Sequence, residues 1–260
     1  MKRYEGILLC SDLDGTLYTS GTKQISPENL EAVKYFISNG GQFTFASGRP
    51  PEYFGPLVEL FGTSTPVIGL SGSAIYDFNK GQYVHSQLLA DSSIKVFNGI
   101  LDQYQDDISV VCIEHLDKTY EYHKGKSSSL EEIKEIFAKV DKNEVFINFF
   151  EAQTASDLRQ KMLADKSLLG DMDFVRSWPE CFEILPRNGN KGAGVKALKE
   201  ILGNVTKTVC VGNYENDVAM IEYADIGYAV GNSCDELKAV ADAITVTNNE
   251  SAIAKIIYEL

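Results

Sequence analysis

Apolar and polar positions alternate in blocks along the first third of the chain, in lengths typical of strands and helices. The short apolar run from Glu5 to Ser11 indicates a strand buried on both faces. A helix start at Ser26-Pro27-Glu28 precedes apolar positions at helical spacing, which stop at Asn39-Gly40-Gly41. A strand, a helix and a strand follow over Gln42 to Ala46, Pro51 to Phe61 and Pro66 to Leu70. Strands that alternate with helices predict a parallel sheet covered on both faces.

The last third repeats this alternation. Its predicted helices are Ala193 to Leu202, Asp217 to Tyr223, Asp235 to Ala241 and Ala252 to Tyr258. Its predicted strands, which lie between these helices, are Thr208 to Val211, Ile226 to Val230 and Ile244 to Val246.

The middle third has a different pattern. Its predicted helices are Ser92 to Tyr104, Ser129 to Val140 and Ala155 to Ala164. Its predicted strands are Tyr83 to Leu89, Ile108 to Glu114, Thr119 to Tyr122, Val145 to Phe150, Phe174 to Trp178 and Cys181 to Leu185. Two pairs of these strands are close enough in sequence to form hairpins, and therefore antiparallel sheet. We predict an α/β, doubly wound, Rossmann-like core over 1–82 and 188–260, with an α+β domain inserted over 83–187.

Composition and charge narrow the class of protein. The 260 residues are 44% hydrophobic, which excludes a disordered chain. A net charge of −13 disfavours nucleic acid and anionic membranes as partners. No apolar run is long enough for a membrane span or a signal peptide, so we expect a cytoplasmic protein. Nothing in the sequence determines the oligomeric state, and a monomer is compatible with an acidic chain of this size. Five scattered cysteines favour small buried side chains over disulfides or a zinc site.

The most informative motif is Asp12-Leu13-Asp14-Gly15-Thr16, directly after the first strand. Ligands of parallel sheets bind at the carboxyl ends of the strands, where two carboxylates at this spacing can face one reacting centre. A calcium loop is excluded, since the glycine comes at the fourth position instead of the sixth. An ordinary acidic turn remains an alternative.

Three further segments fall at the same end of the predicted sheet. Ser47-Gly48 follows the second strand, Lys191 opens the helix after the insert, and Asn213 to Asp217 follows a later strand. Each also has a plain structural interpretation: a turn, a solvated surface charge and a helix cap by Asn213 or Asn216. A lysine at a helix start opposes the helix dipole, however, and therefore needs another reason to be there.

The four segments together suit phosphoryl transfer. An aspartate can be the nucleophile that forms an aspartyl-phosphate. Carboxylate and amide oxygens suit Mg²⁺, which lets an anionic nucleophile approach an anionic phosphate. Lysine and serine can bind phosphoryl oxygens in the transition state.

With D-L-D-G-T, A-S-G-R, N-K-G and G-N-x-x-N-D in this order, the chain resembles the haloacid dehalogenase superfamily over essentially its whole length. The insert, ending in E-I-L-P before the lysine, resembles the Cof-type, type-2-capped, sugar phosphatase-like branch. The resemblance implies that Asp12 attacks phosphorus and that Asp14 is the acid and base. It also implies phosphate or substrate binding by Ser47, Gly48, Lys191 and Asn216, catalytic roles for Ser47 and Lys191, and Mg²⁺ ligation by Asp12, Asp14, Asn213 and Asp217.

Two positions depart from the family pattern. The family usually has aspartate where this chain has Asn213, so we expect weaker Mg²⁺ binding, a higher Mg²⁺ requirement or slow turnover unless Asp217 compensates. The second departure is Leu70-Ser71-Gly72-Ser73-Ala74, where this branch usually shows N-G-A. We assign no residue of the insert a role in substrate specificity.

The function implied by the resemblance is a Mg²⁺-dependent phosphatase that hydrolyses small phosphorylated metabolites, such as sugar phosphates, through an aspartyl-phosphate. Asp14 favours hydrolysis because it can activate the water that releases phosphate. Two alternatives remain. One is a phosphotransferase or mutase, and the other, favoured by Asn213, is a catalytically weak protein that binds phosphorylated ligands.

Overall fold

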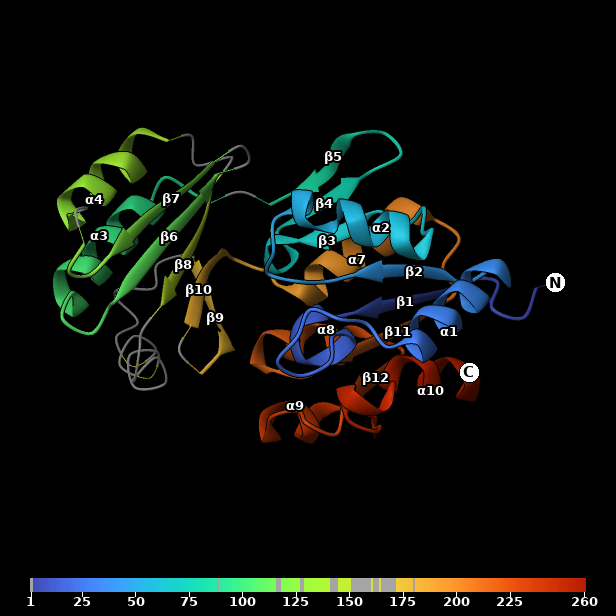
Figure 1. Cartoon of the computed structure of the whole chain (residues 1–260). Coiled ribbons are helices and arrows are strands. Elements are labelled where there is room, and N and C mark those ends of the chain that lie inside the picture. The colour runs from blue at the N-terminus through green and yellow to red at the C-terminus, as the bar shows by residue number, and fades with distance from the viewer. Residues whose placement is uncertain are drawn as a thin grey trace. The chain divides into compact units, whose positions relative to one another are not determined.

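The computed structural model describes residues 2–87, 89–115, 118–126, 129–140, 145–150, 160, 164, 172–179 and 181–260. The chain divides into two compact units, Met1–Ser86 with Asn190–Leu260 and Gln87–Gly189 (Figure 1). Among the described residues, the first unit encloses two hydrophobic clusters and the second unit encloses one. Compactness alone does not show independent folding, so the domain assignment with boundaries after residues 82 and 187 stays a prediction.

A five-stranded parallel sheet forms the centre of the first unit, and its strands come from both ends of the chain. Its order is β13 (Ala243–Ile244), β12 (Ile226–Ala229), β11 (Lys207–Gly212), β1 (Ile7–Ser11) and β2 (Gln42–Phe45). All neighbouring pairs are parallel. Strand β1 pairs with β2, the next strand of this sheet along the chain, and with β11, which comes after the insert.

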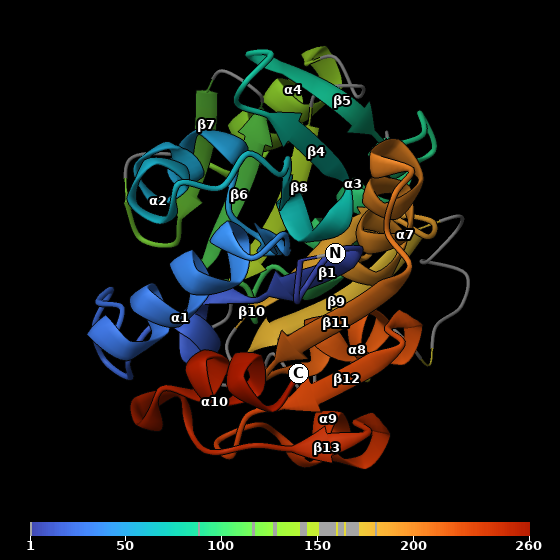
Figure 2. The same ribbon diagram turned by 90° about the vertical axis from the view of Figure 1, so that its right-hand side faces the viewer.

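Helices cover both faces of this sheet (Figure 2), as the alternation along β1 requires. On one face, Leu9 packs in a cluster with residues of α1 (Pro27–Ser38), α2 (Gly55–Phe61) and α10 (Ala252–Glu259). On the other face, Leu8 and Cys10 pack with residues of three helices, α7 (Lys191–Leu202), α8 (Val218–Tyr223) and α9 (Asp235–Val240). The predicted α/β core is confirmed.

A small antiparallel sheet of β3 (Val67–Gly69), β4 (Ala74–Asp77) and β5 (Gln82–Ser86) belongs to the same unit. The strand predicted to open the insert at Tyr83 thus pairs with β4 of the first unit. The reason is a tight turn, in which Asp77 Oδ1 accepts hydrogen bonds from the main-chain N–H groups of Asn79 and Lys80.

The second unit has a five-stranded antiparallel sheet and two described helices, as expected for an α+β insert. The strand order is β7 (Lys118–His123), β6 (Val110–His115), β8 (Val145–Phe150), β10 (Cys181–Pro186) and β9 (Met172–Trp178). Its helices are α3 (Ser93–Tyr104) and α4 (Leu130–Lys139). The helix predicted from Ala155 to Ala164 lies outside the described residues, apart from Gln160 and Ala164.

Side-chain caps fix where two of the helices begin. Ser26 Oγ accepts a hydrogen bond from Asn29 N at 3.2 Å at the start of α1, as predicted. Asn190 Oδ1 accepts one from Ala193 N at 3.0 Å, which makes Lys191 the first residue of α7. All five cysteines are free. No helix in the described part of the chain combines the length and apolar character needed to cross a bilayer.

Candidate active site

The predicted site residues meet at the carboxyl end of the parallel sheet. Asp12 directly follows β1, and its N–H donates to Val211 O of the neighbouring β11 at 3.0 Å. Ser47 comes shortly after β2, and Asn213 directly after β11. Parallel strands end at one edge, so segments more than 160 residues apart in sequence become neighbours in space.

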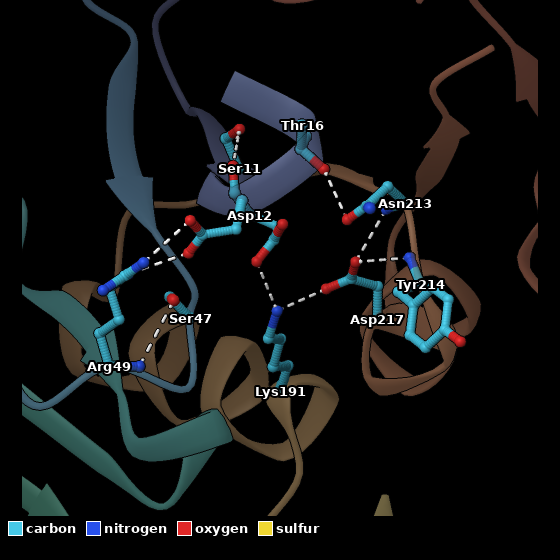
Figure 3. A network of polar contacts seen from close by, with 10 residues as sticks. Ser11, Asp12, Thr16, Ser47, Arg49, Lys191, Asn213, Tyr214 and Asp217 are labelled. Carbon is cyan, nitrogen blue, oxygen red and sulfur yellow. Dashed lines mark hydrogen bonds and ion pairs between the residues drawn. The ribbon is translucent and has the colours of Figure 1, made fainter. Parts of the chain in front are cut away.

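A buried ion cluster connects Asp12, Lys191 and Asp217, which come from three of the predicted segments (Figure 3). Lys191 Nζ lies 2.7 Å from Asp12 Oδ1 and 2.6 Å from Asp217 Oδ1. The side chains of Lys191 and Asp217 are fully buried, and that of Asp12 is 8% exposed. The helix dipole disfavours a cation at the helix start, and two carboxylates offset this effect. Their presence explains why a lysine occupies the position.

The cluster shifts the ionisation of its members. Burial raises the pKa of Asp12 to about 7, Lys191 opposes this rise and Asp217 adds to it. Burial lowers the pKa of Lys191, but Asp12 and Asp217 outweigh burial, so the pKa of Lys191 lies above its ordinary value. Lys191 therefore stays charged, and any further cation beside Asp12 favours the nucleophilic carboxylate form.

Asp14, the second carboxylate of the motif, forms a different ion pair. Its two oxygens accept hydrogen bonds from Arg49 Nε and Nη2, both at 2.9 Å. The Arg49 guanidinium lies 4.2 Å from the centre of the Tyr53 ring, whose hydroxyl contacts Tyr18 Oη at 3.2 Å. Stacking and the bidentate fork hold Arg49 in one geometry, with each oxygen of the Asp14 carboxylate accepting one of its hydrogen bonds.

The loop after β2 presents Ser47 beside this pair. Ser47 is 3% exposed, and its Oγ accepts a hydrogen bond from Arg49 N at 3.4 Å. Its main chain is fixed by Ile68 O, at 3.1 Å, and Ser71 N, at 3.0 Å. Gly48, next in sequence, is partly exposed in the same loop. The serine hydroxyl is thus held by well-bonded backbone.

The segment that departs from the family pattern at Leu70 packs against the start of α7. Leu70 and Ser71 both have left-handed backbone, with φ of 52° and 55°. A Cβ on Gly72 would lie 2.1 Å from the carbonyl oxygen of Asn190. Only glycine fits there, so this loop closes directly onto the helix that carries Lys191.

Asp217, not Asn213 or Asn216, makes the cap-like hydrogen bonds of the turn after β11, so that structural alternative is wrong. Asp217 Oδ2 accepts from Asn213 N at 2.8 Å and from Tyr214 N at 3.1 Å. With Oδ1 on Lys191, both oxygens of Asp217 are engaged by protein donors. Asn216 is buried in the same turn, and within the described residues no hydrogen bond joins its side chain to the ion cluster.

The side-chain amide of Asn213 faces a group of oxygens. One of its terminal atoms lies 3.1 Å from the carbonyl oxygen of Asp14, 3.1 Å from Thr16 Oγ1 and 3.2 Å from Asp12 Oδ2. With oxygen in that place, Asn213 accepts a hydrogen bond from Thr16 (Figure 3). With nitrogen there, all three oxygens are within hydrogen-bond distance, and the two N–H groups can donate to two of them at a time. The oxygen orientation brings a carboxylate, a carbonyl and an amide oxygen together, a donor set that fits a hard divalent cation.

This group of cation-binding oxygens contains fewer than three acidic side chains, and no group of three or more His, Cys, Asp or Glu residues suited to a metal occurs among the described residues.

The structure brings together Asp12, Lys191, Asn213 and Asp217, with Ser47 and Asp14 at the same edge. Sequence reasoning gave Arg49 no role. Its position two residues after Ser47 could have indicated a contact with Asp14, because the loop that carries Ser47 and the loop that carries Asp14 lie at the same edge of the sheet.

A model of the haloacid dehalogenase-like hydrolase family matches residues 9–257. The chain belongs to this family. Phosphatase YwpJ of Bacillus subtilis is 26% identical, over 97% of this chain and 99% of its own. The 5-amino-6-(5-phospho-D-ribitylamino)uracil phosphatase YitU of the same organism is also 26% identical, over 97% and 96%.

Solved structures agree on the fold. A haloacid dehalogenase-like hydrolase from B. subtilis superimposes with a TM-score of 0.80 at 24% identity, covering 97% of this chain and 99% of that one. A sugar phosphatase of subclass IIB gives 0.78 at 19% identity, covering 97% and 98%. The predicted family, fold class and hydrolase character are confirmed. Phosphatases of this family generally use a divalent metal ion.

Proposed function

We propose that the chain hydrolyses phosphate monoesters of small metabolites through an aspartyl-phosphate. The observation that carries this proposal is the contact of Asp12 with Lys191, which fixes one carboxylate oxygen and leaves Oδ2 toward Asn213 and Asp14. In the first step Asp12 forms a bond to phosphorus while the bond to the ester oxygen breaks. Lys191 and Ser47 bind phosphoryl oxygens where negative charge spreads.

Asp14 is the acid and base of this proposal. It gives a proton to the departing ester oxygen and later takes one from the water that attacks the aspartyl-phosphate. Arg49 orients the carboxyl group between these steps through its two hydrogen bonds. Because both oxygens of Asp14 accept hydrogen bonds from Arg49, the pair has to loosen before Asp14 can present a proton to the departing oxygen.

The cation of this proposal is Mg²⁺, held by Asp12 Oδ2, the carbonyl oxygen of Asp14 and the amide oxygen of Asn213. When bound, it neutralises charge between the nucleophile and the phosphate. Asp217 was predicted as a further ligand, but its engaged oxygens favour the role of holding Lys191.

Two relatives support a sugar-like or polyol phosphate as substrate. The name of YitU specifies a phosphoribityl compound, and one structural neighbour is described as a sugar phosphatase. We therefore propose that a phosphorylated sugar or sugar alcohol is the substrate class. The cytoplasm stays the predicted compartment.

The test is phosphate release from a panel of sugar phosphates and one aryl phosphate across a Mg²⁺ series, with Asp12→Asn as the blank. We expect release that depends on Asp12 and is lost with a chelator. Phosphate that moves to an added sugar instead of water would favour a transferase. Binding without turnover in both the parent and Asn213→Asp would favour a phospho-ligand-binding protein, the alternative that the uncharged Asn213 supports.

A further inference from the structure

Asn213 stands at the point where three oxygens converge. Of these, the Asp14 carbonyl oxygen and the Asp12 carboxylate oxygen Oδ2 lie 3.1 and 3.2 Å from the same amide atom of Asn213. Neither the carbonyl nor an ionised carboxylate can donate a hydrogen bond. The chemical identity of the Asn213 atom therefore decides whether these two contacts are attractive.

Without a cation, and with Asp12 in its ionised form, an amide oxygen in this position would face both acceptors with no proton between them. An amide nitrogen in the same position turns the contacts into N–H···O hydrogen bonds, one of them to a carboxylate. The amide nitrogen and oxygen are nearly the same size, so a half-turn of the group exchanges them without repacking. The metal-free protein consequently favours nitrogen toward Asp12 and Asp14.

Because Asp12 is buried, the orientation of the Asn213 amide matters for its carboxylate. The Asp12 side chain is only 8% exposed, and its Oδ1 is already bonded to Lys191. Oδ2 then has the Asn213 amide as its protein donor. A buried carboxylate oxygen that lacks a donor costs free energy.

The neighbouring backbone leaves room for the amide in either orientation. Gly15 has φ of 82°, and a Cβ there would lie 2.5 Å from the outer atom of the Asn213 amide. Thr16 Oγ1 can donate to an amide oxygen or accept from an amide nitrogen, so it serves both states.

We infer that the N–H group of Asn213 takes the place of the cation in the metal-free protein and that the amide turns over when the cation binds. This inference rests on the proposed function for the cation itself. Metal binding must then break two internal hydrogen bonds, so Asn213 weakens the affinity and also stabilises the metal-free state. An aspartate at 213 would do the reverse, since it adds a carboxylate beside Asp12 and Asp217.

The direct test follows the side-chain NH₂ signals of Asn213 by ¹⁵N NMR on the unmodified full chain, with MgCl₂ as the probe. The pair of signals missing from Asn213→Asp identifies them. We expect slow solvent exchange without Mg²⁺, and a shift with faster exchange at saturation. The NH₂ group of Asn204, exposed in the loop after α7, serves as the internal reference for free exchange.

Thermal unfolding with and without MgCl₂ is the second measurement. Without Mg²⁺, Asn213→Asp and Asn213→Leu should each unfold about 2–6 °C below the parent, because neither side chain donates to Asp12. With Mg²⁺, Asn213→Asp should gain more in unfolding temperature than the parent does, and Asn213→Leu should gain least. Asn204→Asp controls for the added charge and should match the parent in both conditions.

Three results would overturn the inference: Asn213 NH₂ exchange as fast as that of Asn204 without Mg²⁺, protection that no Mg²⁺ concentration removes, or Asn213→Leu as stable as the parent without metal. Phosphate release decides the proposed function separately. If the protein releases phosphate but its Asn213 amide does not respond to Mg²⁺, this inference is wrong and the proposed function stands. If the amide responds but no phosphate is released, the proposed function is wrong and this inference stands.

Discussion

Asp12 and Asp14 are two residues apart in the chain, yet their ion pairs have opposite surroundings. The pair of Asp12 with Lys191 is buried, and a second carboxylate, Asp217, shares the lysine. The pair of Asp14 with Arg49 lies near the surface, with side chains 46% and 28% exposed. One motif therefore contains a cation contact that solvent cannot replace and one that it can.

The difference matches the work that each carboxylate has in the proposed reaction. A nucleophile must be held in one place, which a fixed buried cation does, and Lys191 also opposes the rise that burial causes in the pKa of Asp12. An acid and base must gain and lose a proton, so its ion pair must be able to open during the reaction. An exposed ion pair contributes about 1 kcal/mol or less, so opening it requires little free energy.

The largest expected effect comes from removing the shared lysine. Lys191→Met leaves two buried carboxylates without their cation and should cost about 3–5 kcal/mol of unfolding free energy, with loss of phosphate release. Urea unfolding measures the first effect. Lys196→Met, an exposed position on the same helix, is the matched control and should change stability by about 0.5 kcal/mol or less. A loss for Lys191→Met as small as that of the control would contradict the comparison.

A smaller effect on stability, but a large one on turnover, is expected for Asp14→Asn. The amide cannot transfer the proton, so turnover of a sugar phosphate should fall about 10²–10⁴-fold, while the unfolding free energy changes by about 1 kcal/mol or less. The phenol that leaves an aryl phosphate is more acidic than a sugar hydroxyl and needs less protonation. The rate of phenol release should therefore fall less than the rate of sugar release. Equal losses on both substrates would argue against Asp14 as the acid.

The smallest effect should follow Arg49→Lys, which keeps the charge and loses the fork. Turnover should fall less than about tenfold, because a tenfold change corresponds to about 1.4 kcal/mol and an exposed pair contributes less. Salt near 1 M should narrow the difference between parent and variant, since it screens the pair. A difference that salt leaves unchanged would mean that stacking on Tyr53 matters more than charge.

Much of the fold and the main site residues could be predicted from local patterns. Asp12, Ser47 and Asn213 each come directly or shortly after an apolar strand, and parallel topology brings such positions together. The hairpin of β4 and β5 was missed although its turn, Asp77 to Gly81, has typical turn residues between strand-forming runs. That error came from taking the change in pattern at Tyr83 as the start of the insert.

The roles of Arg49 and Asp217 could not be predicted in the same way. Arg49 reaches Asp14 because Tyr53, on the following turn, supports its guanidinium, a contact that depends on side-chain geometry. A carboxylate such as Asp217 can bind a metal, cap a turn or hold a lysine. Residue type alone does not distinguish these roles, since only the position of Lys191 Nζ decides between them.

The place of β1 between β2 and β11 has a consequence for synthesis on the ribosome. Asp12 and Lys191 are 179 residues apart, and the whole of Gln87–Gly189 is translated between them. Until β11 emerges, β1 keeps one hydrogen-bonding edge open, and such edges can pair with other chains. Translation that stalls within the insert therefore leaves an aggregation-prone fragment, whose nucleophile has not yet met its lysine.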